Sequence, residues 1–166
     1  MAKGLGLLLV FSCGVLLGWG KAHAMIQQAR ELAQWREFLR QFRIHLAATR
    51  SSPGEIVRTL GKQTAFTDSP GIQALAEAFE NSSSFAWSIR RAVEGKKKLG
   101  PAEQILLTLG DTVGVKPLEE QLSALAAAEL LMEREADAAR ERSRQYGGLC
   151  QRLGVLLGLL AVVVLA

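Results

Sequence analysis

The chain has 166 residues, of which 20 are basic and 16 acidic, so its formal net charge is only +4 at neutral pH. Because the two signs are interspersed, this charge describes an ordinary solvated surface and argues against nucleic acid as a partner. The two cysteines, Cys13 and Cys150, have neither a C-x-x-C spacing nor a nearby histidine, which argues against a metal site or a redox motif.

Both ends of the chain are apolar. Residues 4–20 (GLGLLLVFSCGVLLGWG) carry no charged side chain, and neither do residues 153–166 (LGVLLGLLAVVVLA). The second run is short for a membrane span and reaches sufficient length only by extension toward the charged segment before it, where Arg152 can reach the lipid headgroups. The pattern predicts an N-terminal transmembrane helix at residues 1–21 and a C-terminal one at residues 150–166.

Charge around the second apolar run predicts the topology. Four arginines precede this run and no basic residue follows it: Arg140, Arg142, Arg144 and Arg152. The positive-inside rule therefore predicts a cytoplasmic middle domain at residues 22–149, with both termini on the opposite face of the membrane.

An exported protein is the alternative topology. The basic start, the apolar run and Ala22-His23-Ala24 resemble a secretory signal, and cleavage after Ala24 would release a tail-anchored helical binding domain. The length of the run and the unbroken helical pattern from Lys21 onward favour a retained membrane helix.

The middle domain begins with an amphipathic pattern. Apolar residues recur at spacings of three and four: Leu32, Trp35, Leu39, Phe42 and Leu46. Such a stripe is typical of one buried helix face. No glycine or proline occurs from Lys21 to Thr49, so the sequence predicts one long helix that runs from the apolar start to about Thr49.

Four short helices are expected next. Their start and stop signals are Ser52-Pro53-Gly54-Glu55 with Gly61, Asp68-Ser69-Pro70 with Ser82, Phe85 with Gly95, and Gly100-Pro101 with Gly110. Proline suits the first helical position and serine the cap before it. We expect Phe79 and Trp87 to face inward and to form the core together with Trp35 and Phe42.

From Pro117 no proline or glycine occurs until Gly147, and one apolar stripe runs along this segment. The stripe consists of Leu118, Leu122, Leu125, Met132, Ala136 and Ala139. A second long helix that continues into the C-terminal apolar run is therefore expected. No alternating strand pattern occurs. The predicted fold is all-α: a six-helix bundle anchored by membrane helices that are continuous with its first and last helices.

Catalytic chemistry is not indicated. Gly61-Lys62-Gln63-Thr64 does not match a phosphate-binding loop. Ile56 stands where the loop needs its first glycine, Gln63 stands where it needs serine or threonine, and no strand precedes the segment. His23 and His45 have no partner at a spacing that suggests a metal or a catalytic triad. We predict no enzyme, no catalytic residue, no cofactor and no metal ligand.

Function is then expected to depend on contacts. The candidate contact residues lie on two connecting segments, the basic turn of Lys96, Lys97 and Lys98, and the linker 111–116 with Asp111, Thr112 and Lys116. A solvated loop is the simpler reading of the lysines. A membrane-linked regulatory adaptor that binds an acidic partner through these lysines is a further alternative.

Several ordered segments resemble the stage III sporulation protein AB family of endospore-forming bacteria. These segments are the helix Leu32 to Leu46, the start Ser52-Pro53-Gly54-Glu55, Leu75 to Phe79, Ala86-Trp87, Leu109-Gly110-Asp111-Thr112 with Gln121, and the tail from Gln145-Tyr146-Gly147-Gly148 to Leu160. Three details depart from the family pattern: His45-Leu46-Ala47-Ala48 replaces an acidic residue and a tyrosine, Asp111 and Thr112 are in swapped order, and Gln121 lies further downstream.

This resemblance implies a domain similar to the F-type inner-membrane platform proteins of type II secretion and type IV pilus systems. It implies a non-enzymatic component of a channel between mother cell and forespore, in the mother-cell membrane that faces the forespore. Its partners would be the lipid bilayer, a secretion-type cytoplasmic ATPase and other membrane proteins of the channel, which the platform would couple mechanically. A homo-oligomer is left open.

Overall fold

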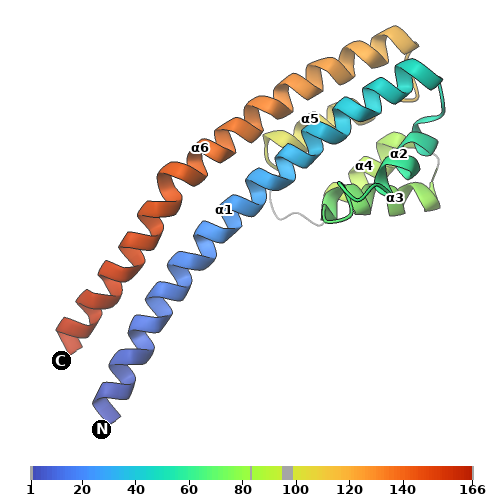
Figure 1. Ribbon diagram of the computed structural model, residues 1–166. Helices are drawn as coiled ribbons and strands as arrows, with labels where there is room; N and C mark the ends of the chain where they lie inside the picture. Colours follow the sequence, from blue (N-terminus) through green and yellow to red (C-terminus); the bar gives the residue numbers. More distant parts are fainter. Residues whose placement is uncertain (1, 83, 95–98, 166) are drawn as a thin grey trace. The chain divides into compact units, whose positions relative to one another are not determined.

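Helices make up the described chain. The computed structural model describes residues 2–82, 84–94 and 99–165, although the side chains of 2–19, 21–22, 147–155 and 157–165 lie outside this description. Within it there are six helices and no strand (Figure 1). They are α1 (Ala2–Thr49), α2 (Pro53–Gly61), α3 (Pro70–Asn81), α4 (Phe85–Val93), α5 (Pro101–Gly110) and α6 (Leu118–Leu165). The predicted all-α order of one long, four short and one long helix is confirmed.

The chain divides into two compact units. One comprises Met1–Ala29 with Asp137–Ala166, and the other, called the core unit below, comprises Arg30–Ala136. Within the described residues no helix is both long enough and apolar enough to cross a bilayer. The predicted membrane helices at residues 1–21 and 150–166 fall almost entirely on side chains outside the description. The predicted boundaries of the middle domain at residues 22 and 149 stay a prediction.

An aromatic cluster forms the centre of the core unit. Trp35 and Phe38 of α1 meet edge to face with ring centroids 5.7 Å apart, and Phe38 meets Phe66 in the same way at 5.6 Å. Phe42 of α1 packs on Phe85 of α4 at 5.5 Å. Such contacts add to the free energy gained by burying the rings. The prediction that Trp35, Phe42 and Phe79 are core residues is confirmed, since all three are buried.

The prediction for Trp87 is wrong. Trp87 is 45% exposed, whereas Phe85, Ile89 and Val93 of the same helix are buried. These three residues recur every four positions and therefore share one face of α4. Trp87 comes two positions after Phe85, about 200° further around the helix, and consequently faces away from the core.

Local capping sets two of the helix ends. The Ser52 hydroxyl accepts a hydrogen bond from the backbone N–H of Glu55 at 3.4 Å, with Pro53 in the first helical turn, as the start signal predicts. At the end of α1, Arg50 has a φ of 49°, a left-handed conformation that usually requires glycine. Its N–H donates to the carbonyl of Leu46 at 3.2 Å, which closes the helix.

Ion pairs join α1 to α6 within the core unit. Arg36 pairs with Glu133 and Arg43 with Glu129, each with a nitrogen–oxygen distance of 3.0 Å. Because the residue numbers rise along α1 while they fall along α6, the two helices run antiparallel here, side by side in Figure 1. All four side chains remain partly exposed, so the pairs mainly favour this register and add little stability.

Candidate functional site

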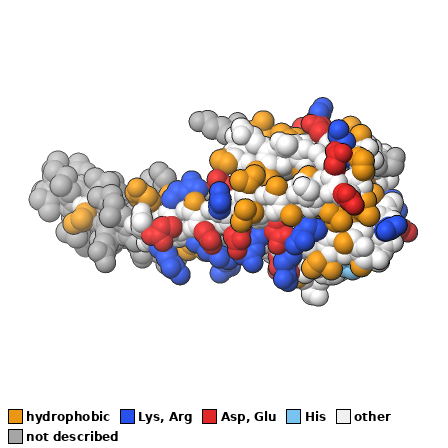
Figure 2. Space-filling view, turned by 90° about the horizontal axis from the view of Figure 1, so that it is seen from above, with side chains coloured by type: hydrophobic (Ala, Val, Ile, Leu, Met, Phe, Trp, Pro, Cys, Tyr) orange, Lys and Arg blue, Asp and Glu red, His pale blue; other side chains and the backbone are white. Residues whose placement is uncertain are grey.

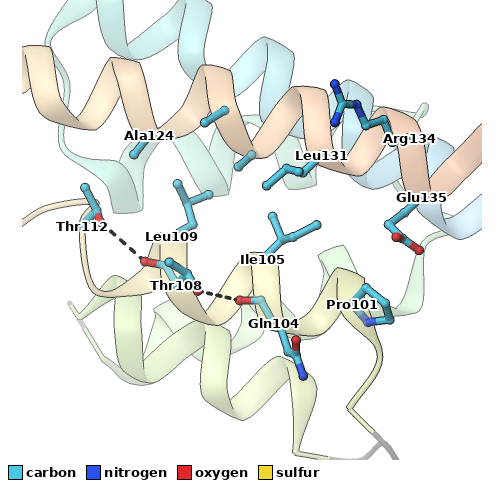
Figure 3. Close-up of a pocket in the computed structure, with 12 residues that line it drawn as sticks. Pro101, Gln104, Ile105, Thr108, Leu109, Thr112, Ala124, Leu131, Arg134 and Glu135 are labelled. Atoms are coloured by element: carbon cyan, nitrogen blue, oxygen red, sulfur yellow. Dashed lines mark hydrogen bonds between the residues drawn. The ribbon is translucent and has the colours of Figure 1, made fainter.

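A groove lies between α5 and α6 in the core unit (Figure 3). Its volume is about 540 Å³. The residues that line it come from α5, the turn that follows and three turns of α6: Pro101, Gln104, Ile105, Thr108, Leu109, Thr112, Ala124, Ala127, Ala128, Leu131, Arg134 and Glu135. The groove therefore has one helix along each wall and is large enough to accept side chains of a further element.

Apolar side chains form most of this surface. Figure 3 shows Ile105 and Leu109 pointing from α5 toward α6, and Leu131 pointing back toward α5. Leu109 is buried, whereas Leu131 is 45% exposed. The other apolar lining residues of α6 are alanines, whose small side chains allow another helix to approach closely.

The hydroxyls of the groove are engaged with their own helix. Thr108 donates to the carbonyl of Gln104 at 2.9 Å, and Thr112 donates to the carbonyl of Thr108 at 3.5 Å (Figure 3). A hydroxyl held in this way is neither paired with a general base nor directed at a bound ligand. The arrangement suits contact with an apolar surface better than it suits nucleophilic chemistry.

Charge is confined to one end of the groove, where Arg134 and Glu135 lie. Elsewhere on the chain the two signs are mixed, and Figure 2 shows acidic and basic side chains interspersed on the face it presents. Among the side chains that the structure describes, no group of three or more His, Cys, Asp or Glu residues is placed to hold a metal ion.

The predicted contact residues that the structure describes, Asp111, Thr112 and Lys116, lie in three different surroundings. Lys96, Lys97 and Lys98 lie outside the described residues. Thr112 lines the α5–α6 groove. Asp111 instead lines a separate pocket of about 430 Å³ together with Arg90. The guanidinium of Arg90 is 3.7 Å from the carboxylate of Asp111. The side chain of Lys116 is exposed, and its backbone carbonyl accepts a hydrogen bond from Gln121 at 2.5 Å.

Comparison with protein families identifies the chain. The model of the stage III sporulation protein AB family matches residues 3–166. The chain belongs to this family. Neither the curated proteins nor the solved structures gave a match.

Gln121 has a structural role in the turn that follows α5. It is in the first turn of α6 and reaches back across this turn. Its side-chain oxygen accepts from the N–H of Gly114 at 3.1 Å, while its amide donates to the carbonyl of Lys116. Gly114 has a φ of 82°, which glycine adopts without strain. In this member of the stage III sporulation protein AB family, Gln121 thus fastens the turn at the end of the groove.

Sequence reasoning missed the groove, although α6 carries a signal for it. The core stripe of α6 includes Leu125 and Met132, both buried. A second stripe lies one residue earlier, with Ala124, Ala127 and Leu131 at spacings of three and four. The apolar arc of α6 is therefore wider than a single stripe, and its second stripe is the part that borders the groove.

Proposed function

We propose that this protein is a non-enzymatic platform of the sporulation apparatus, and that it docks a helix of a partner protein in the α5–α6 groove. Membership of a sporulation family supports the process. The observation that carries the mechanism is the groove itself, which has apolar walls on two helices and hydroxyls engaged with their own backbone. A third helix packed between two others is a common way to fill such a surface.

The membrane is part of the proposal. Apolar runs at residues 4–20 and 153–166 support anchoring at residues 1–21 and 150–166, and the arginines from Arg140 to Arg152 support a cytoplasmic core unit with both termini across the membrane. Each apolar run lies on a helix that continues into the core unit, since α1 and α6 have 48 residues each. A partner that moves the core unit would thereby act on the anchors.

A secretion-type cytoplasmic ATPase is the partner we propose, together with other membrane proteins of the channel between mother cell and forespore. The support is the resemblance of the ordered sequence segments to the stage III sporulation protein AB family, which implies a domain similar to the platform proteins of secretion systems. Thr112 belongs to the proposed contact because it lines the groove. The lysine turn 96–98 stays a second candidate contact.

Two neighbouring leucines provide the test. Leu131 lines the groove, whereas Leu130, on the same helix and similarly exposed at 51% against 45%, does not. The full-length protein is purified in detergent and used to capture the ATPase. Leu131→Glu should reduce capture about tenfold or more, because it places a charge in an apolar contact. Leu130→Glu should leave capture unchanged.

Circular dichroism and resistance to protease verify that each variant is folded. Both variants should pass this control, because substitutions of exposed residues usually change stability by no more than about 0.5 kcal/mol. Equal capture by both variants, with the fold intact, would exclude the groove as the contact. Failure of the unsubstituted protein to capture the ATPase at low salt would count against direct contact between the two proteins.

A further inference from the structure

A second surface, on the other short helices, has no part in the proposed function. Trp87 stands on the outer face of α4 beside a pocket of about 300 Å³ between α3 and α4. The pocket is lined by Ala74, Glu77, Ala78, Asn81, Trp87 and Arg91. The indole of an exposed tryptophan offers a large, rigid contact surface, and tryptophan is enriched among residues that dominate binding energy.

Most polar groups around this pocket already have partners. The guanidinium of Arg91 is held by Glu94 at 2.9 Å, and the side-chain amide of Asn81 donates to the backbone carbonyl of Glu77 at 3.2 Å. The carboxylate of Glu77 is different, since within the described part of the chain only the backbone carbonyl of this residue accepts a hydrogen bond, and its carboxylate makes no hydrogen bond or ion pair. The pocket therefore combines an exposed indole with a carboxylate that makes no ion pair, while Arg91, the cation that lines the same pocket, is paired with Glu94.

The charge around the pocket is mixed, but the guanidinium of Arg91 is neutralised by Glu94, which leaves the carboxylates of α3 in excess. α3 contains Glu77 and Glu80 near its C-terminal end and no basic residue. Carboxylates at this end of a helix add to the negative potential of the last carbonyls, so a positive group is attracted there. The face of an indole attracts cations as well.

We infer that this pocket binds an arginine side chain of a partner protein, with the guanidinium stacked on Trp87 and paired with Glu77. A guanidinium matches both groups, because it is planar, stacks on aromatic rings and pairs with a carboxylate through two parallel N–H groups. The small side chains of Ala74 and Ala78 line the same pocket and take up little of its space. This inference does not depend on the α5–α6 groove or on the identity of its occupant.

The test uses the full-length protein in zwitterionic detergent, with its tryptophan indoles labelled with ¹⁵N. The probe is N-acetyl-arginine amide, and the matched neutral probe is N-acetyl-citrulline amide. The arginine probe should give a saturable shift of the Trp87 indole resonance, with half-saturation on the order of millimolar because a single side chain binds weakly. The citrulline probe should give none. The Trp87→Phe variant assigns the resonance.

Two acidic variants separate the pocket from general acidity. Glu77→Gln should raise the half-saturation concentration about threefold or more, since it removes the paired charge. Glu80→Gln, on the same helix but not among the lining residues, should leave it unchanged within error. An unchanged spectrum of the remaining indoles verifies the fold of each variant. The inference is overturned by the absence of saturation, by equal shifts with citrulline, or by equal weakening in the two variants.

Discussion

Trp35 and Trp87 should respond in opposite ways to truncation. Trp35 is 4% exposed and packs edge to face on Phe38. Its ring also lies so close to Gly71 that a Cβ there would come within 3.0 Å of the indole. Trp35→Ala thus removes a closely packed ring and should cost about 3–5 kcal/mol of unfolding free energy. Trp87 is 45% exposed, and Trp87→Ala should cost less than about 1 kcal/mol.

Urea-dependent proteolysis of the full-length protein in detergent measures both values. With a denaturant slope of about 2 kcal/mol per molar urea, a loss of about 3 kcal/mol lowers the midpoint by about 1.5 M. Trp87→Ala should lower it by less than about 0.5 M by the same conversion. Trp35→Phe serves as a control, because it keeps an aromatic ring beside Phe38 and should recover most of the loss.

Two results would contradict these positions of Trp35 and Trp87. If Trp35→Ala left the midpoint within about 0.5 M of the parent, Trp35 would not be a core residue, since a small domain has only about 5–15 kcal/mol of stability in total. If Trp87→Ala lowered the midpoint as much as Trp35→Ala, the outward position of Trp87 would be wrong, and the pocket beside it would lose its aromatic wall.

Four further predictions concern a helix end, an ion pair, the turn after α5 and the lysines 96–98. Arg50→Gly should raise the urea midpoint, by the equivalent of about 1 kcal/mol, because glycine adopts the left-handed conformation at the end of α1 without strain. A double-mutant cycle of Arg43 and Glu129 should give a coupling of about 0.2–1 kcal/mol that shrinks in 1 M salt, and a salt-independent coupling would contradict an ionic origin. Gln121→Ala should cost about 1 kcal/mol and speed amide exchange in the turn that follows α5. Reversing the lysines 96–98 to glutamate should weaken ATPase capture without altering the circular dichroism spectrum, and undiminished capture would remove this turn from the contact.

The order and ends of the helices could be predicted because their signals are local. Pro53, Pro70 and Pro101 each stand in the first turn of a helix, where the missing N–H is not needed. The serine at position 52 has the expected cap hydrogen bond. Ser69 occupies the same position before α3, yet its hydroxyl is buried and makes no hydrogen bond within the described chain. Serine and proline at the start of a helix thus predict the helix boundary even where the cap hydrogen bond is absent.

The faces of short helices are harder to predict than their ends. α4 has only nine residues and carries apolar side chains on two sides, so its periodicity does not decide between Phe85 and Trp87. The turns present the same difficulty. Phe66 and Val113 are each 1% exposed, but both lie outside any helix and belong to no periodic pattern. Which of these residues is buried depends on how the helices pack against one another.

The α5–α6 groove depends on packing in the same way, and it also explains why a contact function fits this fold. When the apolar arc of a helix is wider than the surface that the rest of its domain covers, the uncovered part contacts either solvent or another protein. On α6 the stripe of Leu125 and Met132 is covered by the core unit, while Leu131, in the stripe beside it, stays open. The alanines along that second stripe keep the opening wide enough for a helix backbone to approach, which larger side chains would prevent. In the proposed docking, contact specificity would therefore reside in residues of α6 that do not belong to the core stripe.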